Sequence, residues 1–280
     1  MLTEIKKDTD LEEKLVSRSG SVDYVSNNSY DLNTIDSACR KFKAFYEFVI
    51  NLEPFPESVA DVNQAKMKLV DFLDLTEVLS EEEMHLFIDH ISIYENSQIE
   101  DSGLFLTMLM HNYFESGKSY LMLKSENFQR VTALCGELER YRDHRIKLTV
   151  ESEVGEGFGQ SAKYVDFELK DDIGVGSFAC AKYCTATIIG FVPGEVGWGA
   201  RNCEFTIYED GTFAVPDEAR DCTYILEGDL ASSFKIKNKI QNCVFKTSKY
   251  NNIDILIGAV SKSNRLLSKE NANEVIYIDN

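Results

Sequence analysis

The sequence predicts an α+β protein in which an all-α domain precedes a parallel β-helix, a β-solenoid with 19-residue coils. Two observations lead to this fold class. Apolar residues recur at helical spacing from Thr34 to about Arg142, and from Ile146 onward they alternate with polar residues as in a β-strand. The strand pattern then returns every 19 residues, which is the signature of a stacked repeat.

The chain is expected to fall into three parts. Residues 1–31 are polar and form a segment with a short helix at 3–16 followed by a loose connector. Residues 32–144 are expected to form the α-helical domain, and residues 145–280 the β-helix domain with a C-terminal cap. A length of 280 residues is sufficient for one large domain or two of ordinary size.

The α-helical domain is expected to contain about five helices. Ser80 and Glu83 have the spacing of a capping box, in which each side chain bonds the other residue's backbone N–H, so a helix opens with these two residues. The remaining helices follow from apolar stripes at helical spacing. The expected helices cover residues 35–49, 59–73, 80–91, 99–114 and 125–141.

Each coil of the predicted solenoid carries one strand phrase with three inward-facing positions. A two-residue insertion precedes the last phrase. The triplets are Ile146, Leu148 and Val150; Val165, Phe167 and Leu169; Cys184, Ala186 and Ile188; Cys203, Phe205 and Ile207; Cys222, Tyr224 and Leu226; and Cys243, Phe245 and Thr247.

Other columns of the repeat keep the same register. An alanine and then a base precede the second to fifth phrases, at Ala162, Ala181, Ala200 and Ala219 followed by Lys163, Lys182, Arg201 and Arg220. The next position holds a turn-tolerant residue in the later coils (Asn202, Asp221, Asn242) and tyrosine in the first two (Tyr164, Tyr183).

The coils are expected to stack, because a single coil cannot bury its apolar face. Stacked parallel strands lie about 4.8 Å apart and supply one another with hydrogen bonds. A stack leaves two open ends that need cover. The helical domain is expected to cover the first end, and residues 252–260 with residues 274–278 the last.

Two consecutive coils carry a glycine-patterned phrase followed by an Ala-base element. They read Val165-Asp-Phe-Glu-Leu, Ile173-Gly-Val-Gly and Ala181-Lys-Tyr, then Cys184-Thr-Ala-Thr-Ile, Val192-Pro-Gly and Gly199-Ala-Arg-Asn. This pattern resembles the right-handed β-helix at the C-terminus of the glutamate synthase large subunit, a module that formylmethanofuran dehydrogenase also carries in one of its subunits. The resemblance covers about 100 residues and implies a right-handed winding.

The resemblance implies a scaffold and no reaction of its own, because in both relatives this β-helix carries no catalytic residues. The sequence also departs from the family pattern. The glycine cluster has decayed in the coil with Gly211 and is missing from the coil with Gly228. No glutamine-amidotransferase or flavin-binding segment is recognisable, and no family motif is recognisable in the helical half.

Composition restricts the classes of partner. A formal net charge of −18 would repel a phosphate backbone, so a nucleic acid is not expected. The longest uncharged run, residues 102–114, is shorter than the roughly 20 residues of a membrane-spanning helix. The N-terminus has no apolar signal core, which indicates a cytoplasmic protein without membrane attachment.

The cysteine column (Cys184, Cys203, Cys222, Cys243) has two interpretations. Thiols stacked on successive coils could ligate a metal or a cluster. Because Ile146 and Val165 occupy the same column in earlier coils, core packing is the favoured interpretation. No catalytic, cofactor or metal residue is expected, since no P-loop, HExxH, Gly-x-Ser-x-Gly or dinucleotide motif is present.

Lys163, Lys182, Arg201 and Arg220 are the candidate partner-binding residues, together with Trp198. The four bases either bind an acidic partner or anionic ligand, or pair internally with an offset acidic column, or are simply solvated. That acidic column contains Glu153, Asp172, Asp210 and Asp229. Trp198 either packs on a neighbouring coil or forms an exposed binding anchor.

The expected function is that of a non-enzymatic scaffold or protein-interaction protein that needs no cofactor. It would bind a protein partner or a second copy of itself. Two alternatives stay open. One is an accessory subunit of a redox or amidotransferase complex, and the other is an enzyme whose site lies in the groove between the two halves.

Overall fold

The computed structural model describes residues 32–50, 76–91, 102–208, 214–215, 218–230, 234–236, 240–264 and 273–278. All of these residues belong to one compact unit, Leu32–Asn280. The helices expected at 3–16 and 59–73 lie outside the described residues, as does Gly211.

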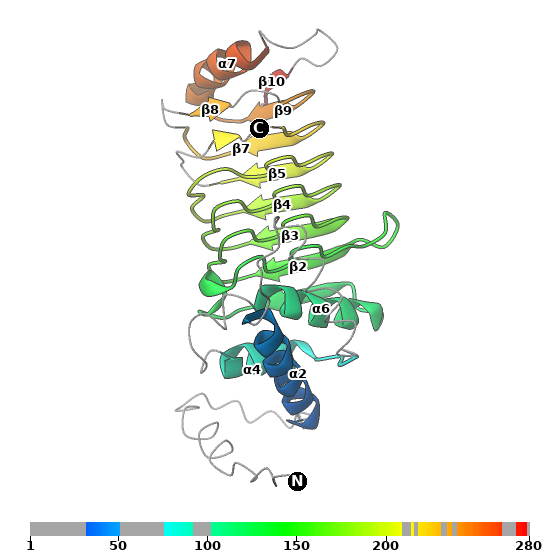
Figure 1. Ribbon diagram of the computed structural model, residues 1–280. Helices are drawn as coiled ribbons and strands as arrows, with labels where there is room; N and C mark the ends of the chain where they lie inside the picture. The colour runs from blue at the N-terminus through cyan, green and yellow to red at the C-terminus, as the bar shows by residue number, and fades with distance from the viewer. Residues whose placement is uncertain are drawn as a thin grey trace, which may run out of the picture. The chain divides into compact units, whose positions relative to one another are not determined.

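A parallel β-solenoid dominates this unit (Figure 1). Its main sheet has eight strands in the order β1-β2-β3-β4-β5-β7-β9-β10, and a second sheet pairs β6 (Ala214–Val215) with β8 (Lys235–Ile236). The strands of the main sheet are β1 (Tyr120–Leu123), β2 (Ile146–Val150), β3 (Val165–Leu169), β4 (Thr185–Ile188), β5 (Glu204–Ile207), β7 (Thr223–Leu226), β9 (Val244–Thr247) and β10 (Glu274–Tyr277).

The predicted register of the coils is confirmed. Asp166 pairs with Thr185, Thr185 with Glu204 and Glu204 with Thr223, so each step is 19 residues long. The step from Thr223 to Val244 is longer by the expected two-residue insertion. In β3, β4, β7 and β9 buried residues alternate with partly exposed ones, as the strand phrases predict.

The turn column has the left-handed backbone that its residue types predict. Asn202, Asp221 and Asn242 each have φ of 53°, and Tyr164 and Tyr183 have the same conformation, with φ of 57°. The two tyrosine rings stack in parallel with centroids 4.9 Å apart. A left-handed conformation is unfavourable for tyrosine, so this stacking offsets part of its cost.

The prediction of a helix at residues 125–141 is wrong. Only a single 3₁₀ turn, η1 (Phe128–Arg130), is helical there, and Cys135 and Glu137 have φ of 60° and 62°, which no α-helix accommodates. Glu139 instead forms a β-bridge with Lys163. The segment is therefore part of the first coil, and the sheet begins at Tyr120, ahead of the expected boundary at 145.

The reason for this error lies in the spacing of the apolar residues. Val131, Leu134, Cys135 and Leu138 are all buried and lie three or four positions apart, which matches one face of a helix. In the solenoid they turn inward at successive corners of the coil. Two left-handed corners that the next coil builds with Gly157 and Gly159 are built here by Ala133 and Cys135, so the turn signal is missing.

Three described helices precede the solenoid: α2 (Leu32–Ile50), α4 (Glu81–Ile91) and α6 (Ser102–Glu115). The capping box at the start of α4 is confirmed, since Ser80 N donates to Glu83 Oε2 at 2.8 Å and Glu83 N donates to Ser80 Oγ at 3.2 Å. Phe42, Phe87 and Phe105 pack against one another between the helices. Over the described ranges, no helix has the length and apolar character needed to cross a membrane.

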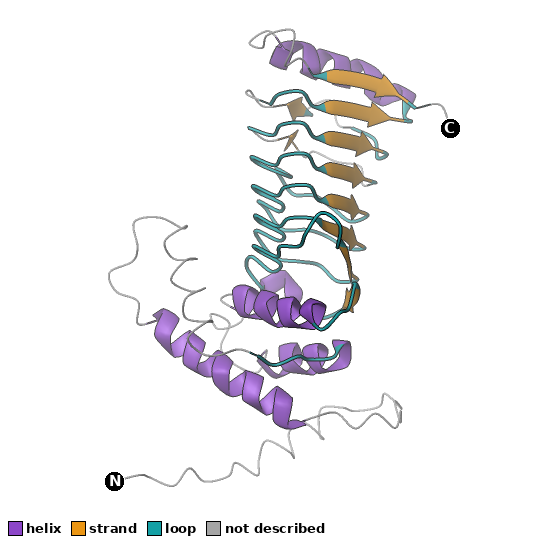
Figure 2. Ribbon diagram, turned by 90° about the vertical axis from the view of Figure 1, so that its right-hand side faces the viewer, coloured by secondary structure: helices purple, strands orange, loops and turns teal. Residues whose placement is uncertain are grey.

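Helix α6 covers the first end of the stack (Figure 2). Its Gly103 lies so close to the first coil that a Cβ there would overlap the backbone oxygen of Thr132. The helices and the coils share one continuous apolar core. The first end is therefore closed by a helix packed against backbone.

Helix α7 (Tyr250–Asn264) and strand β10 cover the last end, as expected (Figure 1). Leu256 and Val260 of α7 are buried in the solenoid core. Asn252, also buried, accepts a hydrogen bond from Leu230 N at 2.9 Å and donates to Gly228 O at 2.8 Å. Its side chain thus satisfies backbone groups at the end of the stack.

A ladder of aromatic rings runs through the core of the later coils. Phe205, Tyr224 and Phe245 stack with centroids 5.3 and 5.4 Å apart. Tyr224 is fully buried, and among the described residues its hydroxyl has no hydrogen-bond partner. An unpaired buried hydroxyl destabilises a core.

We therefore expect Tyr224→Phe to raise the free energy of unfolding by about 1 kcal/mol, because it removes a buried hydroxyl and keeps the stacked ring. The reciprocal variant Phe205→Tyr should lower it by a similar amount. Urea unfolding followed by circular dichroism measures both. A loss of stability in Tyr224→Phe would show that the hydroxyl has a partner.

Candidate functional site

The four predicted bases lie in one row, as the repeat requires. Lys163, Lys182, Arg201 and Arg220 are joined by successive parallel β-bridges between their coils. Their α-carbons are therefore about 4.8 Å apart from one coil to the next. We call these four residues the basic row. The same ladder continues to Glu139 at one end and to Gln241 at the other.

Lys163 is the member of the row with a carboxylate partner. Its Nζ lies 2.7 Å from Glu139 Oε2, and both side chains are partly exposed. Sequence reasoning missed this partner because it placed Glu139 in a helix. The aligned phrases Glu137-Leu-Glu, Ser161-Ala-Lys and Cys180-Ala-Lys are the signal that could have found it.

In the described ranges, no carboxylate forms an ion pair with Lys182, Arg201 or Arg220. Arg201 and Arg220 are exposed, and Lys182 is half-buried. The row therefore presents three cations on a chain whose formal net charge is −18.

The offset acidic column makes other contacts where the structure describes it. Asp172 Oδ1 accepts a hydrogen bond from Phe191 N at 2.7 Å, and Asp229 lies 3.8 Å from Lys249 Nζ. Glu153 is exposed, and Asp210 lies outside the described residues. For the described acids, internal pairing with the basic row is not observed.

Trp198 is 45% exposed, so its ring does not sit within a packed interface with the next coil. Gly197 and Gly199 on either side have φ of 78° and 65°. These left-handed glycines turn the backbone at the tryptophan. Its backbone oxygen accepts a hydrogen bond from Cys180 N at 2.6 Å. Of the two interpretations of Trp198, exposure favours the anchor.

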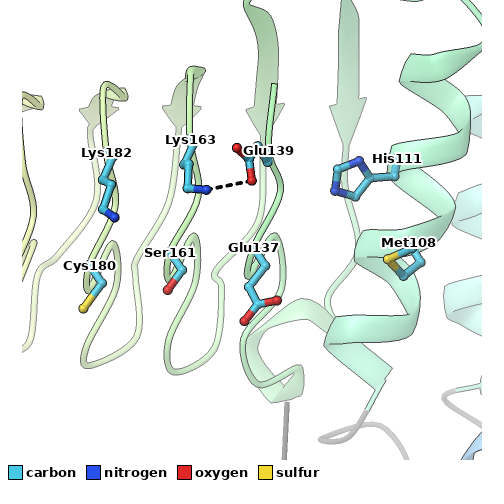
Figure 3. A pocket seen from close by; sticks show the side chains of 8 residues that line it. All are labelled: Met108, His111, Glu137, Glu139, Ser161, Lys163, Cys180 and Lys182. Carbon is cyan, nitrogen blue, oxygen red and sulfur yellow. Dashed lines mark hydrogen bonds and ion pairs between the residues drawn. The ribbon is translucent and has the colours of Figure 1, made fainter. Parts of the chain in front are cut away.

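A groove of about 580 Å³ opens at the Lys163 end of the basic row. Figure 3 shows two parallel columns of side chains from successive coils and a third wall from α6. Sequence reasoning did not single out the acids or the histidine of this groove. Its lining residues are Met108, His111, Glu137, Glu139, Ser161, Lys163, Cys180 and Lys182.

His111 is the titratable group of the helical wall. Burial lowers its pKa below the ordinary value, against the opposing effect of a hydrogen bond to the backbone of Glu137. The imidazole is therefore neutral at neutral pH. The formal charges of the groove then come from Glu137, Glu139, Lys163 and Lys182.

The fold, the basic row and the groove are the features from which a function can be inferred. No protein-family model, curated protein or solved structure matches this chain.

The cysteine column packs in the core. Cys184, Cys203, Cys222 and Cys243 are all buried. Cys203 Sγ donates to the backbone oxygen of Arg201 at 3.3 Å, and Cys222 Sγ donates to that of Arg220 at 3.2 Å. The neighbouring thiols of Cys184 and Cys222, followed by burial, raise the pKa of Cys203. Within the part of the chain that is described, no cluster of His, Cys, Asp and Glu could hold a metal ion.

The thiol hydrogen bonds of the cysteine column lie next to the basic row. Because Cys203 and Cys222 each bond the backbone two residues earlier, they help to fix the strand segments that carry Arg201 and Arg220. The bases thus stand on a rigid, regularly spaced backbone. Arg201 and Arg220 are both exposed.

Proposed function

We propose that this protein is a non-enzymatic scaffold whose basic row binds an acidic protein partner. The observation that carries the proposal is the row itself: three bases without a described carboxylate partner, at equal spacing, on an acidic chain. Electrostatic complementarity of this kind gives specificity and speeds association. Trp198, three positions before Arg201, would supply an apolar anchor at the same edge.

Repulsion within the row supports binding over simple solvation. Two like charges about 4.8 Å apart repel by about 1 kcal/mol in water and by more near a protein surface. A partner that places carboxylates along the row removes this repulsion. Side chains at positions i and i+4 of a helix have their Cβ atoms about 5–6 Å apart, which nearly matches the coil spacing. An acidic helix is therefore the partner element that fits best.

The proposal includes the finer features of the fold. The coils are taken to wind right-handed, as nearly all parallel strand connections do. The residues before the solenoid are taken to form a helical domain that presents or orients it. We place the protein in the cytoplasm, where seven thiols stay reduced. A second copy of the chain is an alternative partner, which sedimentation at two salt concentrations would reveal.

The second candidate is an accessory subunit of a redox or amidotransferase complex. The resemblance of the glycine-patterned coils to the β-helix modules of glutamate synthase and formylmethanofuran dehydrogenase supports it. In that case the basic row would dock onto the catalytic subunit. Mass spectrometry of the native complex distinguishes this candidate from a free scaffold.

An enzyme is the least supported candidate. Cys180 and His111 both line the groove, yet Figure 3 shows them on opposite sides of the coil that carries Glu137. Cys180 lies two coil steps, about 10 Å, from that coil. A nucleophile and its base must approach to about 3 Å. The groove is therefore better suited to binding than to nucleophilic catalysis.

Binding of an acidic helix tests the proposal. The probe is a fluorescent helical peptide with four glutamates at i, i+4 spacing, and the control peptide has the same composition with its glutamates dispersed. We expect the double variant Arg201→Glu/Arg220→Glu to bind the probe at least tenfold more weakly at low salt, where screening is least. Fluorescence anisotropy measures the affinity.

The matched control is Lys118→Glu/Lys124→Glu, at two exposed lysines that flank β1. Each reversal changes the charge by two, so both double variants move the net charge from −18 to −22. Equal weakening in both variants would mean that the row has no special role. Unfolding of the arginine variant would mean that the row pairs internally.

A further inference from the structure

The groove at the end of the basic row has a regular internal geometry. Its upper column is Glu139, Lys163 and Lys182, and its lower column is Glu137, Ser161 and Cys180 (Figure 3). The two columns are offset by two residues, and corresponding members line the same side of the coils (Figure 3). The groove is thus short and runs along the stacking direction, and α6 closes one end.

The positive and negative charges in this groove lie at opposite ends. Glu137 and Glu139 stand on one coil near α6, and Lys163 and Lys182 follow on the next two coils. Glu139 and Lys163, in the middle, neutralise each other at 2.7 Å. Glu137 and Lys182 are left without a charged partner among the described residues. The groove has no net formal charge, but it is negative at one end and positive at the other.

The two unpaired charges define the length of a ligand. The coils that carry Glu137 and Lys182 are two steps apart, which is about 10 Å along the stack, and the two residues lie in different columns of the groove. An extended peptide advances about 3.3–3.6 Å per residue, so three residues span the same distance. The groove volume of about 580 Å³ lies within the range of small-molecule sites. Met108 offers an apolar contact on the helical wall.

We propose that this groove binds a small extended zwitterion of the class of a tripeptide with free termini. Its ammonium group is held by Glu137 and its carboxylate by Lys182. The ion pair between Glu139 and Lys163 lies alongside the middle of the ligand. The site shares Lys182 with the basic row, but it depends on Glu137, which the row does not use. The two proposals can therefore fail separately.

Calorimetric titration of the full-length protein with trialanine tests this site. We expect trialanine to bind more tightly than dialanine or penta-alanine, because its extended length matches the roughly 10 Å between the coils that carry Glu137 and Lys182. N-acetyl-trialanine and trialanine amide should each bind at least tenfold more weakly, since each lacks one charge. These blocked forms also control for apolar length, because they keep the same three residues.

Two variants assign the ends of the ligand. Glu137→Gln should weaken trialanine binding at least tenfold and should remove the difference between trialanine and its N-acetyl form. Lys182→Gln should weaken it similarly and remove the difference from the amide. Glu137 is exposed and Lys182 half-buried on the surface of their coils, so both variants should keep the wild-type circular dichroism spectrum.

The outcomes separate this site from the basic row. Arg201→Glu/Arg220→Glu should lose the acidic helix but keep trialanine within twofold, and Glu137→Gln should do the reverse. No detectable binding of trialanine, or binding that Glu137→Gln leaves unchanged, would overturn the proposed site. Neither result would affect the acidic-helix experiment.

Discussion

Replacing Gly103 by alanine is expected to lower the free energy of unfolding by about 3 kcal/mol, at the upper end of the cost of overpacking. A Cβ at this position would overlap Thr132 O and stand 2.9 Å from Leu134 N. Both neighbours are backbone atoms of the first coil, so neither can rotate away. Helix α6 would have to withdraw, which would expose buried residues of the shared core such as Phe105.

Gly258→Ala is the matched control, because Gly258 lies in helix α7 with nothing within 4 Å of its Cβ position. This change should be neutral or raise stability by up to about 1 kcal/mol through helix propensity. Urea unfolding of the two variants makes the comparison. Equal free energies of unfolding for the two variants would mean that α6 does not pack on the first coil as described.

Replacing Asn252 by alanine should also cost about 3 kcal/mol, because a buried side chain with several hydrogen bonds is lost. Its amide bonds Leu230 N, Gly228 O and, at 3.2 Å, Thr247 Oγ1. The first two partners are backbone groups of a buried end of the stack, and alanine would leave them unpaired. Relative to the wild type, the variant should show a larger increase in hydrogen-exchange rate in β9 and β10 than in β3 and β4.

Asn251→Ala controls for the loss of an asparagine in the same helical turn. Asn251 is exposed, and we expect a change within about 0.5 kcal/mol. A small effect at Asn252 would contradict the role of α7 as a hydrogen-bonded cap. In that case the end of the stack would be protected mainly by the apolar contacts of Leu256 and Val260.

The sequence was sufficient to predict the register of the solenoid because two periods coincide there. Side chains alternate along each strand, and the whole phrase returns after 19 residues, so a shifted register would place charges inward. Cys203 and Cys222 could be assigned to the core for the same reason. The capping box of α4 was predicted from two residues, since its chemistry is local.

Features that depend on contacts between distant segments were not predictable in this way. The corners of the first coil are built without glycine, and its buried residues have the spacing of a helix face. The sequence pattern therefore predicted a helix in place of a coil. Glu139 was consequently not placed beside Lys163. The groove depends on α6 packing against the first coil, and no periodic signal in the sequence reports that contact.

The left-handed tyrosines show a further limit. Asn202 and Asp221 predict a turn by their residue type. Tyr164 and Tyr183 have the same left-handed backbone conformation because of their position in the repeat. Their parallel stacking at 4.9 Å became visible only when the coils were stacked. This column therefore accepts an aromatic side chain next to the basic row.

That tolerance allows the most direct test of the binding edge. A photoreactive phenylalanine derivative at position 202 would stand beside Arg201, in the column where tyrosine is already accommodated. The same group at the 80% exposed position 250 on helix α7 serves as the control. We expect irradiation with the acidic helical peptide to give a covalent adduct at position 202, to give none at position 250, and to lose the adduct when Arg220 is changed to glutamate. Adducts of equal yield at both positions, or an adduct that persists without Arg220, would contradict binding along the basic row.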